Sequence, residues 1–313
     1  MSVDTGEGIM TPEQQELAPI AWNESVWFSD IDDTLIDTMA ASIPGSEGIH
    51  LTFAAHCGED KAVEMQSNFN AIFQHMIDGY RVRSEADWEH IDGGKQGFDD
   101  LVESVAAVQT QVKDNYGHIK KWSREVFIKL AADRAGVAVT PELVHEAADA
   151  YWVTLTEKIE IFPDAIELAN TIRQHGRPLF LVTSSDARLK MQPDGQFMYD
   201  PQYSEALKRQ RIELLRARGL QFNTVSIGDP EDKPHPDFFT KAIKMAETEL
   251  GQPIDTSKAI MLGDSFAGDL QTPKEQLGFG FVVLRESNRT DPVVDDAHQL
   301  TTGSISVASS YLS

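Results

Sequence analysis

Short apolar runs separated by stretches of helical spacing make up most of the second half of the chain, and one such run lies near its start. None of them alternates polar and apolar residues, and continuous runs of this length are typical of parallel strands buried on both faces of a sheet. The stretches between them repeat apolar residues at helical spacing, as Ile166, Ala169 and Ile172 do. This alternation predicts a doubly wound α/β domain with a parallel sheet. The predicted strands are residues 26–29, 178–182, 224–227, 259–262 and 281–284.

Residues 38–162 follow a different pattern. Apolar residues form two long helical stripes, over 62–80 and over 98–112, and Thr140 with Pro141 is typical of a helix start. The Met and aromatic residues of the stripes are expected in a helical core rather than around a cofactor. The pattern predicts an all-α domain inserted after the first strand. The predicted division is a flexible leader at 1–20, an α/β core from 21–38 and 160–313, and the helical domain at 39–159.

Composition narrows the class of protein. A length of 313 residues fits about two domains. The single cysteine, Cys57, excludes an intrachain disulfide and a cysteine zinc cluster, and it fits a reducing compartment. No apolar run approaches the ~20 residues that span a bilayer. The first 20 residues lack the basic start and apolar core of a signal peptide, so we expect a cytoplasmic protein.

The charge balance bears on the partners. There are 27 basic and 50 acidic residues, a net charge of -23, which disfavours nucleic acid and anionic membranes as partners because both are bound mainly through cationic contacts. A phosphorylated metabolite would need local positive charge. Two segments are locally basic, 118–124 and 208–218, and both are expected to be solvated helix faces.

Acidic residues follow two of the predicted strands, at the edge where ligands of an open parallel sheet bind. Asp30 and Asp32 come after the first strand, Asp264 comes after the strand at 259–262, and Asp269 lies about one turn later. Carboxylates gathered in one place repel each other unless a cation neutralises them. Oxygen donors without a nearby His or Cys favour Mg²⁺ over zinc, so the sequence predicts a magnesium site.

Two further strand ends carry groups that suit phosphoryl chemistry. A carboxylate beside Mg²⁺, with a second acid two residues on, is typical of a nucleophile and its general acid/base. The hydroxyl of Thr183 and the ammonium of Lys233 can hold a phosphoryl group. Each feature alone has a structural alternative, because an Asp-x-Asp pair often forms an Asx-turn and a lone Lys is usually solvated. Their occurrence at four strand ends favours a common site.

Four segments resemble the motifs of the haloacid dehalogenase-like (HAD) hydrolases. Residues 29–37, Ser-Asp-Ile-Asp-Asp-Thr-Leu-Ile-Asp, are similar to the first motif, and residues 181–184, Leu-Val-Thr-Ser, are similar to the second. The segment 233–239, which opens with the motif lysine, resembles the third. The segment 263–269, Gly-Asp followed by a further acid, resembles the fourth. The resemblance spans about 22–38 and 160–290, and it implies a Rossmann-like core with a cap domain inserted after the first motif.

The resemblance implies a covalent mechanism. Asp30 would attack phosphorus and form an aspartyl-phosphate, and Asp32 would protonate the leaving oxygen and then activate water. Mg²⁺ would be held by the Asp30 carboxylate, the backbone carbonyl of Asp32 and Asp264.

The resemblance also implies how phosphate is held. Thr183 and the adjoining Ser184 would bind the phosphoryl oxygens, and Lys233 would neutralise charge on the nucleophile and the phosphate. Asp269 would orient Lys233 or a metal-bound water.

Within the family, Asp32 favours a phosphatase acting on a small phosphorylated metabolite, because cleavage of a carbon–halogen bond needs no acid at that position. A phosphomutase uses the same residues and differs in whether the cap excludes water. A non-catalytic module that binds metal or phosphate is the alternative from a different class.

The chain also departs from the family pattern. Residues 190–203 are expected to be an extra loop that forms one wall of the site, and Asp33, in place of the usual Gly, is expected to point away from the metal. The inserted domain is expected to move on hinges marked by Pro44, Gly45 and Pro163. Six of its side chains are possible anion contacts, although the surface is expected for each: His56, His75, Arg81, Arg83, Lys120 and Lys121.

Overall fold

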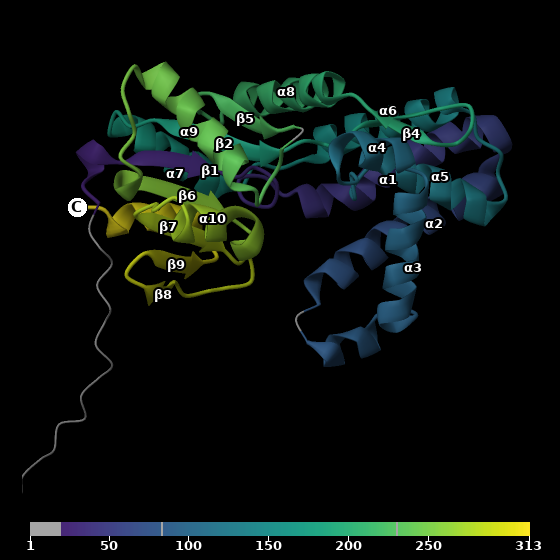
Figure 1. The fold of residues 1–313 in the computed structure, drawn as a ribbon, viewed down its shortest axis with the longest axis horizontal. Coiled ribbons are helices and arrows are strands. Elements are labelled where there is room, and N and C mark those ends of the chain that lie inside the picture. Colours follow the sequence, from purple (N-terminus) through teal and green to yellow (C-terminus); the bar gives the residue numbers. More distant parts are fainter. Residues whose placement is uncertain (1–19, 83, 230) are drawn as a thin grey trace, which may run out of the picture.

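A mainly parallel sheet forms the centre of one lobe of the molecule. The computed structural model describes residues 20–82, 84–229 and 231–313. Within these residues, seven strands form one sheet in the order β5-β2-β1-β6-β7-β9-β8 (Figure 1). All neighbouring strands are parallel except β8 and β9. The first five strands along the chain in this sheet confirm the predicted doubly wound core: β1 (Val26–Ser29), β2 (Leu179–Ser184), β5 (Val225–Gly228), β6 (Ala259–Gly263) and β7 (Phe281–Arg285).

Helices cover both faces of this sheet, because its central strands are apolar on both sides. On β1, Trp27 belongs to the hydrophobic cluster that includes α7 (Pro163–Gln174) and α8 (Pro201–Ala217). Its neighbour Phe28 belongs to the cluster on the opposite face, which includes α9 (Pro236–Leu250). The successive side chains of one strand therefore hold two helical layers on the sheet.

The edge strand β8 (Val293–Asp296) and its neighbour β9 (Gln299–Thr302) were not predicted from the sequence. Their residues are mostly polar, and β8 is largely open to solvent. The remaining elements of this lobe are short: η1 (Trp22–Glu24), η3 (Thr256–Lys258), η4 (Phe266–Leu270), α10 (Gln271–Glu275) and η5 (Ile305–Tyr311).

A helical insertion lies between β1 and α7, as predicted, and forms the second lobe in Figure 1. Its long helices α1 and α6 pack closely: a side chain at Gly48 would place its Cβ 2.4 Å from the Ala150 carbonyl oxygen. The proposed hinge residues Pro44 and Gly45 lie inside α1, so the loop expected there is a helix. The elements of the insertion are α1 (Thr38–Cys57), α2 (Glu59–Arg81), η2 (Glu85–His90), α3 (Gly94–Ala107), α4 (Thr110–Tyr116), α5 (Arg124–Ala135) and α6 (Pro141–Lys158).

The expected loop at 190–203 is instead a β-hairpin followed by the start of α8. Strands β3 (Leu189–Met191) and β4 (Phe197–Tyr199) pair in an antiparallel ladder. The hairpin binds to the insertion: Phe197 N–H donates to the Val108 carbonyl (2.8 Å), and buried Arg188 pairs with Glu125 (2.5 Å). Residues 190–203 were expected to form a wall of the site. Their apolar side chains instead attach this segment of the core to the helical lobe.

Two predictions fall wholly or partly on residues that the structure does not describe. The leader at 1–20 lies outside the described residues apart from Ile20, which is buried, and Arg83 lies outside them too. None of the helices in the described part of the chain has the length and apolar character needed to cross a membrane.

Candidate active site

Two neighbouring strands deliver the first carboxylates of the site. Asp30 follows β1 and Asp264 follows β6, and the Asp30 N–H continues the ladder by donating to the Leu262 carbonyl (2.9 Å). Asp269 comes back to the same point from η4. Carboxylate oxygens of these three aspartates all lie within 4.8 Å of one another, as expected for acids at adjacent carboxyl ends of a parallel sheet.

A glycine allows this close approach. A side chain at Gly263 would place its Cβ 2.4 Å from the Asp269 Cβ. The backbone N–H of Ser265 donates to Asp269 Oδ2 (3.0 Å), which fixes the orientation of that carboxylate. The glycine of the Gly-Asp motif therefore allows Asp269 to pack closely, and the aspartate of the motif supplies a carboxylate to the site.

Lys233 supplies positive charge to this cluster. Its Nζ donates to Asp30 Oδ1 and to Asp269 Oδ1, each at 2.6 Å. Burial disfavours the ammonium, but the two carboxylates outweigh burial and raise the pKa of Lys233. Lys233 is therefore a permanent cation at the nucleophile position, oriented by Asp269.

One ammonium does not balance three carboxylates. Burial, with the neighbouring carboxylates, raises the pKa of Asp30 to about 7. Asp264 is open to the cavity, and partial desolvation there, with the neighbouring carboxylates, raises its pKa to about 8. No hydrogen bond or ion pair to the Asp264 carboxylate is found among the described residues. An excess of crowded, hard oxygen donors is the environment that a divalent cation such as Mg²⁺ fits, so the residues present suit the metal that the family pattern implies.

Asp32 has a different environment. Its Oδ2 accepts a hydrogen bond from Lys208 Nζ (2.6 Å), and its Oδ1 accepts from Thr38 Oγ1 (2.8 Å) and from Arg211 Nη1 (3.3 Å). Burial opposes ionisation of Asp32, but the charges of Lys208 and Arg211 prevail and hold its pKa well below the usual range. Asp186 shares both cations and completes the cluster.

The prediction that 208–218 is a solvated helix face is therefore wrong for its first residues. Lys208 is 1% exposed and Arg211 5% exposed. A signal was available in the sequence, because both residues lie on the face of α8 that also carries Ile212 and Leu215. Sequence reasoning missed them, and it missed Asp186 in the turn after β2.

The predicted phosphate-binding hydroxyls lie at the end of β2. Ser184 lines the cavity and its Oγ donates to Asp232 (2.8 Å). Thr183 is fully buried and its Oγ1 donates to the neighbouring Ser184 carbonyl (3.4 Å). Ser185, which was not predicted, also lines the cavity.

Asp33 occupies a backbone position that favours glycine, which explains why the family pattern usually has Gly there. Its φ is 56°, in the left-handed region that Asp tolerates better than most residues. Its Oδ1 accepts from the Met39 N–H (2.9 Å), which anchors the start of α1. Burial raises its pKa to about 6.

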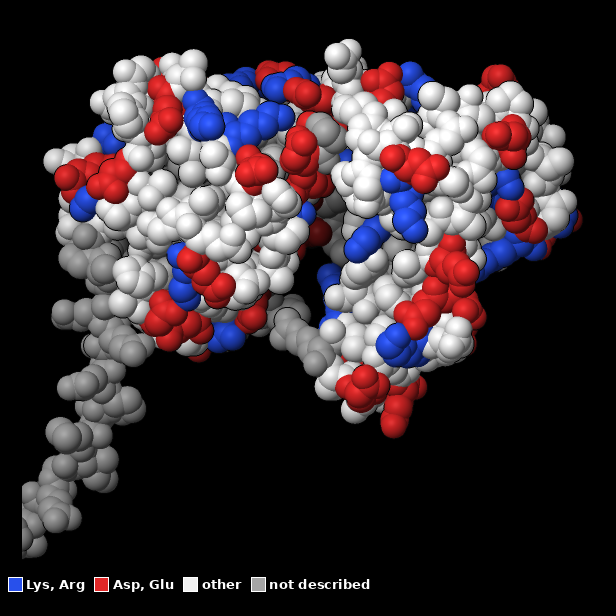
Figure 2. All heavy atoms as spheres, viewed as in Figure 1, with Lys and Arg blue, Asp and Glu red and all other residues white. Residues whose placement is uncertain are grey.

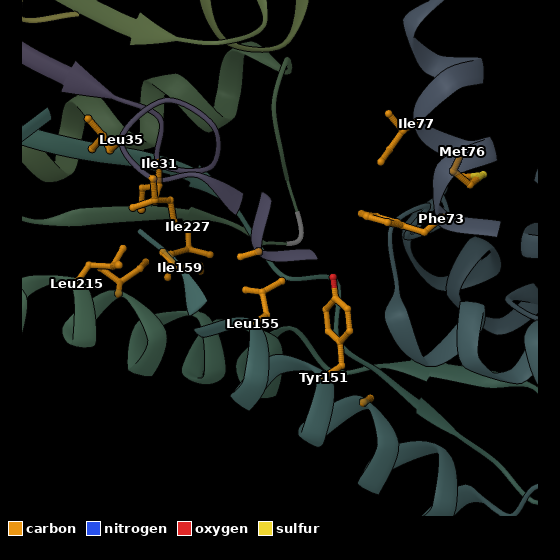
Figure 3. Packing of buried hydrophobic residues seen from close by; sticks show 14 of the residues in the cluster. Ile31, Leu35, Phe73, Met76, Ile77, Tyr151, Leu155, Ile159, Leu215 and Ile227 are labelled. Atoms are coloured by element: carbon orange, nitrogen blue, oxygen red, sulfur yellow. The ribbon is translucent and has the colours of Figure 1, made fainter. Parts of the chain in front are cut away.

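These groups open into a cavity of about 500 Å³ between the core and the insertion. Figure 2 shows the molecule hollowed between its lobes, with acidic side chains on the core side. Phe73 and Ile77 point from α2 toward this space (Figure 3). The insertion also contributes Met39, Tyr80, Arg81, Trp122, Arg124 and Trp152.

The second basic segment, 118–124, is solvated only in part: His118 and Lys121 are exposed, whereas Lys120 and Arg124 are buried. Lys120 is 6% exposed, and its Nζ lies 3.6 Å from Asp229 and over the ring of Tyr199. Arg124 is 7% exposed. Buried aromatic and acidic neighbours, distant in sequence, make these cations part of the interior.

The other proposed anion contacts of the insertion have different surroundings. Arg81 lines the cavity and is exposed, and Lys121 lies over the ring of Tyr80. His56 is exposed and contacts Glu146 at 3.4 Å. His75 lies against Phe98.

The protein family that matches this chain agrees with the geometry of the candidate active site. The family of haloacid dehalogenase-like hydrolases matches residues 26–275. No curated protein matches the chain. The chain belongs to the haloacid dehalogenase-like hydrolases, which confirms the resemblance of its motifs.

Several solved structures are similar to this chain. One is the magnesium-bound HAD-hydrolase YfnB from Bacillus subtilis, with a TM-score of 0.52 and 12% identity over 92% of this chain and 98% of that chain. Others are a HAD phosphatase from Thermococcus onnurineus (TM-score 0.46, 18% identity, 90% and 94%) and a 2-haloacid dehalogenase from Pseudomonas syringae pv. Tomato DC3000 (TM-score 0.49, 15% identity, 92% and 97%). At such identities the likeness to YfnB shows the fold.

Proposed function

We propose that this hydrolase is a Mg²⁺-dependent phosphatase that cleaves a small phosphorylated metabolite through an aspartyl-phosphate on Asp30. The observation that carries the proposal is the bridge from Lys233 Nζ to Asp30 and Asp269, at 2.6 Å each, beside the unpaired carboxylate of Asp264. This arrangement leaves Asp30 Oδ2 without a protein partner among the described residues, and that oxygen is the nucleophile in the proposal.

Asp30, the Asp32 carbonyl and Asp264 are the residues that would hold the metal, which would neutralise charge on the phosphoryl group and on the attacking carboxylate. Lys233 neutralises part of the charge that develops on the phosphoryl oxygens, because its ammonium already lies against the nucleophile. Ser184 and Ser185 offer hydroxyl donors on the same cavity wall, with Thr183 buried beside them.

Asp32 transfers the protons in this proposal. Lys208 and Arg211 hold it as a carboxylate, which is the form that accepts a proton from water when the aspartyl-phosphate is hydrolysed. Protonation of the leaving oxygen needs a proton on the same carboxylate. Substrate binding must therefore weaken the contacts of Asp32 with these cations before the ester is cleaved.

Two observations separate this proposal from its alternatives. The cavity opens to the surface between the lobes (Figure 2), which favours water rather than a second sugar or alcohol as the acceptor and disfavours a phosphomutase. Asp32 with its three hydrogen-bond donors has no use in a non-catalytic binding module.

The net charge of -23 supports a small substrate rather than nucleic acid or a membrane, and we place the activity in the cytoplasm.

The test is release of phosphate from 4-nitrophenyl phosphate and from a panel of phosphorylated metabolites, with Mg²⁺ and after exhaustive chelation. Hydrolysis should require Mg²⁺ and should fall to background in Asp30→Asn. Asp99→Asn is the matched control, since Asp99 is an exposed residue of α3 that pairs only with Lys95. Full activity without metal, or in Asp30→Asn, contradicts the proposal.

A further inference from the structure

An unpaired guanidinium lies in the wall of the cavity that faces the aspartates. Arg124 lines the cavity and is 7% exposed. Among the described residues, its hydrogen-bond partner is the Trp122 carbonyl, which accepts from Nη1 (2.6 Å), and Nε is buried without a partner. No carboxylate pairs with Arg124 in the part of the chain that the structure describes, whereas the next residue, Glu125, pairs with Arg188.

A buried guanidinium without a carboxylate partner destabilises the fold of the free protein. Burial of a charge is unfavourable unless a partner compensates it. Other buried cations of the molecule follow this rule: Lys208, Arg211 and Lys233 each contact two carboxylates. Arg124 is the exception among these side chains, so its partner is expected to be a group that arrives in the cavity.

Aromatic rings surround this guanidinium. Its Cζ lies 4.4 Å from the ring centre of Phe73 and 5.3 Å from those of Tyr151 and Trp152. The rings hold the planar group in one orientation, which preserves its fork of donors for an oxyanion.

Trp152 connects this position with the catalytic acids. Its ring also lies 5.5 Å from Cζ of Arg211, which pairs with Asp32. Trp152 lines the cavity, and its Nε1 is a second buried donor without a partner. The Trp152 indole ring thus lies near both Arg211, which pairs with Asp32, and Arg124, which has no carboxylate partner among the described residues.

We propose that Arg124 binds a second oxyanion of the substrate, a carboxylate or a phosphate distinct from the phosphoryl group that is cleaved. Phe73, Trp122 and Trp152 then contact the carbon skeleton between the two anions. The proposal rests on the proposed phosphatase function and deepens it: the substrates are phosphomonoesters that carry another oxyanion, and Arg124 discriminates in their favour.

The first experiment compares matched phosphomonoesters that differ only in a terminal group: carboxylate, phosphate or the neutral carboxamide, on alkyl and aryl skeletons of increasing length. For the best skeleton, kcat/KM of the wild type should favour an oxyanion over the carboxamide by about 10–100-fold, the range expected for a hydrogen-bonded charge in a buried site. Comparison of the carboxylate and phosphate members identifies which oxyanion is preferred.

Arg124→Met should reduce this ratio to near one, and Arg124→Lys should retain part of it because the charge stays but the fork of donors is lost. The control is Arg134→Met, an exposed arginine of the same helix, which should leave the ratio unchanged. Arg124→Met should also melt at the same temperature as the wild type or higher, because an unpaired buried charge is replaced by an apolar side chain that suits aromatic neighbours. A purely structural Arg124 predicts the opposite, a lower melting temperature with an unchanged ratio.

A binding experiment without catalysis separates the two proposals. Benzoate, with benzamide as the neutral control, is titrated in the presence of a chelator while tryptophan fluorescence is recorded, since Trp122 and Trp152 line the cavity. Saturable binding of benzoate that Arg124→Met loses supports the oxyanion site even if no phosphomonoester is cleaved, in which case the proposed function alone fails. Phosphatase activity with equal kcat/KM for charged and neutral members, and no benzoate binding, overturns the oxyanion site alone.

Discussion

The sheet presents six carboxylates to the cavity, whereas the helical insertion presents aromatic rings and guanidinium groups and, among the described residues, no acid. The core wall is built around strand ends that backbone ladders hold in place. Four of its acids, Asp30, Asp32, Asp186 and Asp269, contact a lysine or an arginine. The wall of the insertion comes from the start of α1, from α2, from residues 122–124 at the start of α5, and from α6. The difference supports our proposal that the core performs the chemistry and the insertion selects the substrate. The acids are Asp30, Asp32, Asp33, Asp186, Asp264 and Asp269.

Among changes that keep the nucleophile, the largest effect on the core wall is expected from Asp32→Asn. Loss of proton transfer should lower kcat by ~10²–10⁴-fold. The loss should be similar for substrates with and without a second oxyanion, in contrast to Arg124→Met. Steady-state kinetics on the matched phosphomonoesters checks this, and a loss confined to one class of substrate would break the division between the walls.

Metal removal should affect the core wall in a pH-dependent way. The raised pKa values of Asp30 (about 7) and Asp264 (about 8) stabilise the metal-free fold fully only below pH 4, and this contribution is lost as the pH rises through 7 and 8. The melting temperature of the chelated protein should therefore fall between pH 6 and pH 8.5, by about 2–4 °C per kcal/mol lost. Mg²⁺ should reverse the fall, since it binds the deprotonated carboxylates.

The control for this measurement is Asp264→Asn, whose amide does not titrate. Its metal-free melting temperature should depend less on pH in this range. An increase on adding Mg²⁺ that is equal at pH 6 and pH 8.5 would show that these carboxylates are not the metal ligands.

Lys208→Met should weaken the chemistry without altering substrate preference. Lys208 acts through Asp32, so its loss should lower kcat by about 10-fold and move the acidic limb of the pH–rate profile upward, because the pKa of Asp32 is no longer held down by that charge. Arg209→Met is the control, since the adjacent Arg209 pairs with Glu205 at the surface. A lower rate with an unmoved pH profile would assign Lys208 a structural role only.

The sequence was sufficient for the five parallel strands at the centre of the sheet and for the acids of the four motifs. It was not sufficient for Asp186, for the cations that partner Asp32 or for the residues of the insertion that face Asp32. The central strands are short apolar runs, and adjacent parallel strands must end at one edge, so Asp30 and Asp264 could be placed together. Lys208 shares a helix face with Ile212 and Leu215, a signal that shows burial but not the partner. The partners of Lys208 and the burial of Arg124 depend on α8 and α5 packing against segments far away in the chain. Asp186 and Arg211 could not be paired for the same reason. The hairpin at 189–199 was missed since its strands are only three residues long.

Changes where the hairpin at 189–199 attaches to the insertion should have the smallest effect on activity and a measurable effect on stability. Arg188→Met leaves Glu125 buried without its partner, which should cost about 3–5 kcal/mol of unfolding free energy. Lys190→Met, on the same hairpin, removes a half-exposed pair with Asp200 and should cost less than about 1 kcal/mol. Urea unfolding measures both, and equal costs would show that the hairpin does not hold the insertion.

The central claim is that the core wall performs covalent phosphoryl transfer, and the most direct measurement is rapid quench of the protein with 4-nitrophenyl phosphate, followed by peptide mass spectrometry. The 4-nitrophenolate group leaves without a proton from Asp32, so Asp32→Asn slows formation of the aspartyl-phosphate less than its hydrolysis. Phosphate should be found on the peptide that carries Asp30, and it should accumulate further in Asp32→Asn, where hydrolysis of the aspartyl-phosphate is slowed. No phosphorylated peptide should form in Asp30→Asn. Phosphate on another residue, or turnover with no phosphorylated peptide in Asp32→Asn, would contradict the account.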